Sequence, residues 1–384
     1  MHNKLFTLDS EQETLTNQLQ QIVFAEINKN NNYISFSRYM ELALYHPSLG
    51  YYNNLLYKFG KHGDFVTAPL ISELFGTCVS HQILELFNHQ VNPNILEVGS
   101  GNGQLMLDIL SQIGDKLTHY YILELSANLA NLQQQRLEQE LPQYKDKVIW
   151  LTDLPLDFKG VILANEVLDA QPCEVVHWQP NQVSLRGVTN QGGKFSYVDI
   201  KASGEVLDIA NSLATNQADY ISEISLINRG FICSLAECLA SGVILLIDYG
   251  YTAHEYYSEM RNRGTLRGFF RQHQLDDVLI YPGLIDITAS VDFTAIATSG
   301  IGSGLDLIGY TKQANFLINC GIVSQLENKK QQLNDLEYLK MSNQVNRLIS
   351  PNEMGEAFKV LAFSKNIEFA DFIGFSQGDK SHTL

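Results

Sequence analysis

The chain has 384 residues, of which 45% are hydrophobic and 10% aromatic. A chain of this length can bury a sizeable core and is long for one compact domain, so we expect one catalytic core with substantial additions. The formal net charge of −16 disfavours a general nucleic-acid binder, because phosphate affinity comes mainly from clustered Lys and Arg. No apolar run reaches the roughly 18 to 20 residues that cross a bilayer, so we expect no membrane insertion.

The N-terminal stretch carries Asp9, Glu11 and Glu13 and has no apolar secretory core. This composition is unlike a secretory signal or an organellar transit peptide, and it indicates a cytoplasmic, bacterial protein. The five cysteines, an odd number, are scattered through the chain and show no zinc spacing and no disulfide framework. We therefore expect reduced thiols and no metal site.

The first 75 residues are predicted to form an N-terminal helical segment and a lid. Residues 11–29 place Leu15, Leu19 and Val23 at helical spacing, and residues 63–69 form an aromatic loop. Asp64, Phe65 and Thr67 of this loop are candidates for a lid over a bound substrate or cofactor. The alternative is that the loop only anchors the N-terminal segment.

From residue 76 the pattern becomes strand, turn and helix in repetition. Strands are predicted at 95–98, 120–123, 148–151 and 160–163, with helices at 104–113 and on to residue 137. Such alternation indicates an α/β fold with a mostly parallel, Rossmann-like sheet, of which 76–172 is the first part.

Residues 173–240 interrupt this pattern and are interpreted as an inserted α+β subdomain. They hold three runs typical of antiparallel strands, at 175–178, 183–188 and 195–200, and 203–240 reads as helical. The core is predicted to resume at 243–248, and residues 241–384 form its second part with a C-terminal segment.

The glycine-rich run Leu96-Glu97-Val98-Gly99-Ser100-Gly101-Asn102-Gly103 stands where the first strand turns into a helix. Glycine allows backbone to turn sharply and to approach a ligand closely. The spacing does not match the dinucleotide fingerprint, since Gln104 and Met106 occupy its last position in the two possible counts. Gly99, Gly101 and Gly103 after the acidic Glu97 instead suit S-adenosylmethionine, which carries a cationic amino-acid end and no pyrophosphate.

Two acids follow the next strands. Glu124 comes about 20 residues after the glycines, where an acid can accept both ribose hydroxyls. Asp153 follows the third strand and is either a partner of the adenine amino group or a solvated turn acid.

Several separate blocks of the chain, in order, resemble the MidA family of methyltransferases. They are residues 35–52, 63–69, 96–103, 164–170, 248–250, 264–267, 282–283, 286–288 and 291–294. The eukaryotic members of this family are mitochondrial protein arginine methyltransferases that assist assembly of respiratory complex I. The resemblance implies a class I methyltransferase fold, an arginine acceptor in a protein and, as partner, a respiratory-complex subunit.

An arginine acceptor places acids at the carboxyl edge of the sheet, because carboxylates can grip two guanidinium nitrogens and orient the third. Glu166 and Asp169 follow the fourth strand and share one face if a helix starts there. Asp248 ends the fifth strand, and Asn165 is a candidate to hold the methionine end of the cofactor. The alternatives are a helix-capping acid for Glu166, a surface charge for Asp169 and a structural acid for Asp248.

Three other functions stay open at this point. The enzyme could methylate a carboxylate, a hydroxyl or a small-molecule nitrogen. The fold could serve as a cofactor-binding assembly or interaction protein with little turnover. A nicotinamide oxidoreductase is disfavoured by Gln104.

Overall fold

The computed structural model describes residues 6–54, 67–213, 219–368 and 372–384. The chain divides into two compact units, each assembled from separate segments. Unit 1 comprises Met1–Phe65, Leu168–Arg229 and His254–Ser290; unit 2 comprises Val66–Val167, Gly230–Ala253 and Val291–Leu384.

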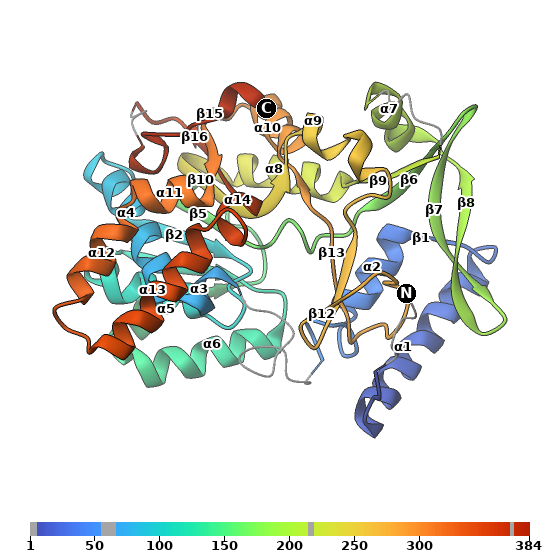
Figure 1. Cartoon of the computed structure of the whole chain (residues 1–384), viewed down its shortest axis with the longest axis horizontal. Helices are drawn as coiled ribbons and strands as arrows, with labels where there is room; N and C mark the ends of the chain where they lie inside the picture. Colours follow the sequence, from blue (N-terminus) through green and yellow to red (C-terminus); the bar gives the residue numbers. More distant parts are fainter. Residues whose placement is uncertain (1–5, 55–66, 214–218, 369–371) are drawn as a thin grey trace. The chain divides into compact units, whose positions relative to one another are not determined.

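Unit 2 is built on an eight-stranded sheet in the order β15-β16-β10-β5-β2-β3-β4, with β14 paired to β10 (Figure 1). Its strands are β2 (Asn94–Val98), β3 (His119–Leu123), β4 (Val148–Leu151), β5 (Phe158–Asn165), β10 (Leu239–Tyr251), β14 (Val291–Asp292), β15 (Asp306–Lys312) and β16 (Phe358–Lys365). The strands from β4 to β10 are parallel, and β16 runs antiparallel to both β10 and β15. Order and direction match a Rossmann-like sheet whose chain order reverses between β2 and β5, where such sheets bind ligands.

Helices cover both faces of this sheet. They are α3 (Ala68–Ile71), α4 (Glu73–Asn88), α5 (Gln104–Ile113), α6 (Ala127–Glu140), α8 (Leu226–Cys238, from Gly230 on), α10 (Phe293–Gly302), α11 (Gln313–Asn319), α12 (Ile322–Lys329), α13 (Asp335–Ile349) and α14 (Met354–Ala357). Short 3-10 turns follow at η1 (Gly114–Lys116), η2 (Pro142–Lys147), η4 (Ile373–Phe375) and η5 (Ser381–Thr383). Because helices cover both faces, the ends of the strands are the part of the sheet that the helices leave uncovered.

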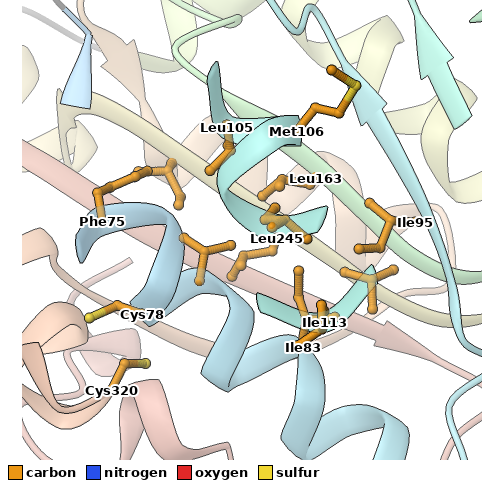
Figure 2. Packing of buried hydrophobic residues seen from close by; sticks show 14 of the residues in the cluster. Phe75, Cys78, Ile83, Ile95, Leu105, Met106, Ile113, Leu163, Leu245 and Cys320 are labelled. Atoms are coloured by element: carbon orange, nitrogen blue, oxygen red, sulfur yellow. The ribbon is translucent and has the colours of Figure 1, made fainter. Parts of the chain in front are cut away.

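One face of the sheet packs against α4 and α5 in a continuous apolar core. Figure 2 shows Phe75 and Ile83 of α4 and Leu105 of α5 packed in one cluster with Ile95 of β2 and Leu163 of β5, all of them buried. Each strand contributes every second residue because successive side chains point to opposite faces. This core fixes α5, and with it the turn that precedes α5, onto the sheet.

Unit 1 contains two antiparallel sheets and three longer helices. One sheet has the order β1-β7-β6-β9 with β8 paired to β7, and the other the order β12-β11-β13. The strands are β1 (Ile34–Ser35), β6 (Glu174–Gln179), β7 (Gln182–Gln191), β8 (Lys194–Lys201), β9 (Tyr220–Ile224), β11 (Arg267–Phe270), β12 (His273–Leu275) and β13 (Asp286–Thr288). The helices are α1 (Ser10–Lys29), α2 (Phe36–Tyr45) and α7 (Gly204–Leu213), with short turns α9 (Ala253–Tyr256) and η3 (Glu259–Arg261). Its main core joins α1 and α2 to the strands through buried residues such as Leu19, Tyr39 and Ile287.

Two parts of the sequence-based prediction differ from this architecture. Residues 203–240 are not helical throughout, since Tyr220–Ile224 forms β9 beside β6. The segment His254–Ser290, predicted as core, belongs to unit 1, because β11 and β13 pack with α1 and α2 rather than with the sheet of unit 2. The α/β class with a mostly parallel sheet is confirmed. Among the described residues, no helix combines the length and apolar character that a membrane crossing requires.

Candidate functional site

The glycine turn joins β2 to α5 at the switch point of the sheet. Gly99, Gly101 and Gly103 have φ angles of +67°, +56° and +82°, which side chains with a Cβ rarely adopt. A Cβ on Gly99 would lie 3.0 Å from Cγ2 of Val167. All three glycines are therefore required by the backbone itself, and the turn presents main chain at the site.

Glu97 supports the turn from beneath. Its side chain is buried, and its Oε2 accepts hydrogen bonds from the hydroxyls of Ser100 at 2.7 Å and Tyr120 at 2.8 Å. Burial raises the pKa of Glu97 to about 7, although both hydrogen bonds oppose the shift. Glu97 thus holds Ser100 of the turn against β3, which accounts for an acid at this position independently of any ligand contact.

Glu124 follows the last residue of β3. Its Oε1 accepts from the backbone N–H of Ser126 at 3.0 Å and its Oε2 from Nε2 of Gln133 at 3.1 Å. Burial raises the pKa of Glu124, and these hydrogen bonds to the charged form oppose the rise. The backbone N–H of Leu125 also bonds this carboxylate. A carboxylate offers about four lone-pair sites, so about one remains for a ribose hydroxyl.

Residues of α6 that the sequence analysis did not single out brace the same turn. Gln133 is fully buried and bonds the carbonyl of Gly101, and Nη1 of Arg136 donates to the carbonyl of Asn102 at 3.0 Å. Arg136 also donates to Oε1 of Gln104 at 2.8 Å. The Gln-rich composition of this helix resembled a solvated face, and only the inward position of Gln133 at helical spacing from Leu137 distinguished it.

Asn165 and Glu166 stand at the end of β5. Nδ2 of Asn165 donates to Oε1 of Glu166 at 3.3 Å, and the backbone N–H of Ala68 donates to the same oxygen at 2.9 Å. Glu166 has a φ of +55°, which is uncommon for a residue with a side chain. Its carboxylate therefore meets the first residue of α3, while its backbone N–H donates to the carbonyl of Ile247.

Asp248 lies on the neighbouring strand β10. Asn165 is paired in register with Ile247, so Glu166 and Asp248 are the residues that follow a matched pair on adjacent parallel strands. Asp248 is 1% exposed and accepts from the backbone N–H of Tyr249 at 2.8 Å. The two acids thus share one edge of the sheet, and the roles assigned to them stay predictions.

Asp169 belongs to unit 1, whereas Glu166 and Asp248 belong to unit 2. No helix starts after β5; the chain is irregular from Glu166 on, so the three-residue spacing gives no shared helical face. Asp169 is buried in unit 1, where its carbonyl accepts from the backbone N–H of Ala289 at 2.9 Å. The condition for a shared helical face, a helix that starts after β5, is therefore not met, and the catalytic role of Asp169 stays a prediction.

The remaining candidates are Asp153, Thr67, Asp64 and Phe65. Asp153 is exposed beyond β4, with its carboxylate accepting from the hydroxyl of Thr152 at 2.9 Å. Thr67 precedes α3 in unit 2 without a side-chain cap on that helix. Asp64 and Phe65 lie outside the described residues. Among the residues that the structure describes, no group of three or more His, Cys, Asp or Glu side chains could hold a metal ion.

The strand-end residues fit S-adenosylmethionine. Oδ1 of Asn165 is buried without a hydrogen-bond partner within the described part of the chain, and it is an acceptor that an ammonium group would satisfy. Glu124 retains acceptor capacity on the strand next to the glycine turn, where a ribose is held in sheets of this kind. We therefore pair Asn165 with the amino-acid end of the cofactor and Glu124 with its ribose. The exposed backbone of the glycine turn leaves room for the part of the cofactor between them.

Comparison with known proteins gives the same cofactor. Residues 78–311, more than half of the chain, match the family model of S-adenosyl-L-methionine-dependent methyltransferases. A protein of Burkholderia thailandensis, solved with bound S-adenosyl-homocysteine, is 36% identical and superposes with a TM-score of 0.93 over 99% of this chain and 100% of its own.

Curated relatives resemble the chain over most of its length. The mitochondrial protein arginine methyltransferase NDUFAF7 of Xenopus laevis is 30% identical over 86% of this chain and 81% of its own. The protein of the same name in Mus musculus is 30% identical over 87% of this chain and 81% of its own. With the matched family model and the switch-point geometry, these similarities show that the chain belongs to the S-adenosyl-L-methionine-dependent methyltransferases, with S-adenosylmethionine as cofactor.

Proposed function

We propose that this methyltransferase transfers the methyl group to a guanidinium nitrogen of arginine in a protein. The observation that carries the proposal is the placement of Glu166 and Asp248 directly after the register pair Asn165 and Ile247, on adjacent strands. The relatives named protein arginine methyltransferases support the same acceptor.

The acceptor chemistry explains why acids suit this edge. A guanidinium stays protonated and spreads its charge over three nitrogens, so no nitrogen has a fully available lone pair. A carboxylate that bonds two of the nitrogens orients the third behind the methyl carbon and can accept the proton that leaves on attack. Half-buried Glu166 is the acid suited to touch the acceptor, and the buried Asp248 stands beside it.

The test is a transfer assay with full-length protein, tritium-labelled S-adenosylmethionine and arginine-bearing peptides. Acid hydrolysis and chromatography should recover the label as methylarginine, and Gly101→Val should abolish transfer, because a β-branched residue is strained at a φ of +56°. Peptides with lysine in place of arginine are the matched control. Label that is released by mild base would assign a carboxylate acceptor instead, and saturable cofactor binding without transfer would favour an assembly protein.

We propose further that the acceptor protein is a subunit of a respiratory complex. The support is the likeness of the residue blocks to a family whose eukaryotic members assist complex I assembly. Mass spectrometry of respiratory complexes from cells with and without this protein should locate a methylarginine that disappears in its absence. Unchanged methylation of every subunit would contradict this choice of partner. A cytoplasmic location of this protein stays a prediction.

A further inference from the structure

Gln133 of α6 connects the ends of three strands of the cofactor sheet. Its Nε2 donates to the carbonyl of Gly101 at 2.8 Å and to Oε2 of Glu124 at 3.1 Å, while its Oε1 accepts from Nε1 of Trp150 at 2.9 Å. Gly101 follows β2, Glu124 follows β3, and Trp150 belongs to β4. The side chain of Gln133 is 0% exposed, so water does not compete for these bonds.

The contact with Trp150 decides which way the amide faces. An indole N–H can only donate, so it must meet the amide oxygen of Gln133. The amide nitrogen is then turned toward two acceptors, the carbonyl of Gly101 and the carboxylate of Glu124. Had the amide been reversed, three unfavourable pairs would result: donor against donor at Trp150, and acceptor against acceptor at Gly101 and Glu124.

We infer that Gln133 is a positioning residue for the cofactor, which aims the Glu124 carboxylate at the ribose and fixes the carbonyl of Gly101 in the glycine turn. This inference rests on the assignment of Glu124 to the ribose and is independent of the identity of the methyl acceptor. It gives Trp150 a role as well, since its N–H sets the orientation of the amide.

The charge on Glu124 provides a second consequence. Burial raises the pKa of Glu124, and the hydrogen bond from Gln133 lowers it. The charge of Glu124 in turn contributes to the raised pKa of the buried Glu97. Loss of the amide donor therefore raises the pKa of Glu124 further, and the acid begins to lose its second acceptor oxygen at a higher pH.

The experiment measures the Kd of S-adenosylmethionine by calorimetry for full-length wild type, Gln133→Met and Gln134→Met. Methionine matches glutamine in length and removes both the donor and the acceptor. Gln134 is exposed on the same helix and supplies the control. We expect Kd to rise roughly tenfold or more for Gln133→Met, because three half-buried polar groups lose a partner, and to stay within about twofold for Gln134→Met.

Two further variants keep the inference falsifiable. Trp150→Phe removes the indole N–H and keeps a smaller aromatic ring, and we expect a smaller rise in Kd, roughly threefold, because the amide is then free to rotate. In the double variant with Glu124→Gln, the effect of Gln133→Met should shrink, since the two residues act together. A folded Gln133→Met protein with lower Tm and unchanged Kd would make Gln133 merely structural and overturn the inference.

The pH dependence separates this inference from its premise. As the pH is lowered, S-adenosylmethionine binding by Gln133→Met should begin to weaken at a higher pH than binding by wild type. The comparison is repeated in a Glu97→Gln background, which removes the titration of Glu97. If Glu124→Gln alone leaves Kd unchanged, the ribose assignment fails. If Glu124→Gln weakens binding and Gln133→Met has no effect, the positioning role fails.

Discussion

Glu166 combines a left-handed backbone conformation with a carboxylate that accepts from Ala68 and Asn165. A glutamine side chain at this position would retain an oxygen acceptor for the N–H of Ala68 and lose the negative charge. We therefore expect Glu166→Gln to leave the Kd of S-adenosylmethionine within about twofold and to lower kcat roughly 100-fold, the scale of general acid–base catalysis. Calorimetry and the peptide assay measure the two quantities.

The control for this variant is Glu138→Gln, an exposed acid on α6. Simultaneous loss of cofactor binding and turnover in Glu166→Gln would show that Glu166 only caps α3. That outcome would move the search for an acceptor acid to Asp248.

The raised pKa of Glu97 should make the stability of the protein depend on pH. Its pKa in the folded protein is about 7, above the ordinary value of 4.5, so the folded state binds the proton more tightly than the unfolded state. The free energy of unfolding should therefore fall as the pH rises from about 4.5 to 7. Glu97→Gln removes this titration and should flatten the curve, with a difference of up to about 3 kcal/mol across that range.

Urea unfolding of wild type and Glu97→Gln between pH 5 and 8 measures this difference. Burial also raises the pKa of Asp108 to about 7, but Asp108 is present in both proteins and cancels in the comparison. Parallel curves for the two proteins would contradict the buried, proton-binding state of Glu97.

At the scale of elements, Gly76 of α4 lies directly against Asp108 of α5. A Cβ there would lie 2.3 Å from Cβ of Asp108, so the two helices would have to separate. Gly76→Ala should destabilise the protein by about 2 kcal/mol, the cost of forcing extra volume into a packed contact. Gly230→Ala in α8 meets nothing within 4 Å and should instead stabilise by about 0.5 to 1 kcal/mol.

Urea unfolding measures the change in the free energy of unfolding for both variants, and the two changes should have opposite signs. If both substitutions stabilised the protein, the close contact of α4 with α5 would be wrong. The glycine turn and α5 rest on this contact, so Gly76→Ala should also weaken S-adenosylmethionine binding in the same samples.

The elements also show what sequence can and cannot predict. Helix 104–113 was predicted with the bounds of α5, because a glycine turn and an apolar face mark both its start and its inward side. The helix on which a shared face of Glu166 and Asp169 depended does not form, because the chain leaves unit 2 after Val167. Strand β9 and the buried role of Gln133 depend on contacts distant in sequence, which local periodicity does not encode.

At the scale of the molecule, the net charge of −16 bears on the choice of acceptor. A negative protein attracts a cationic peptide over a distance limited by salt screening. We expect the KM of an arginine-rich acceptor peptide to rise several-fold between about 50 and 500 mM salt, with kcat unchanged. A peptide of the same length with acidic flanks should show the opposite trend, and a KM independent of salt for both would contradict electrostatic recruitment.

The position of β16 has a consequence for the order in which the protein is made. This strand lies between β10 and β15 in the sheet, yet it is the last strand in the chain. Every segment of unit 1 has been synthesised once Ser290 has left the ribosome, whereas the sheet of unit 2 must wait for Lys365. Until then β10 presents an unpaired apolar edge, so the nascent chain depends most on protection from aggregation while the segment from Val291 to Lys365 is translated.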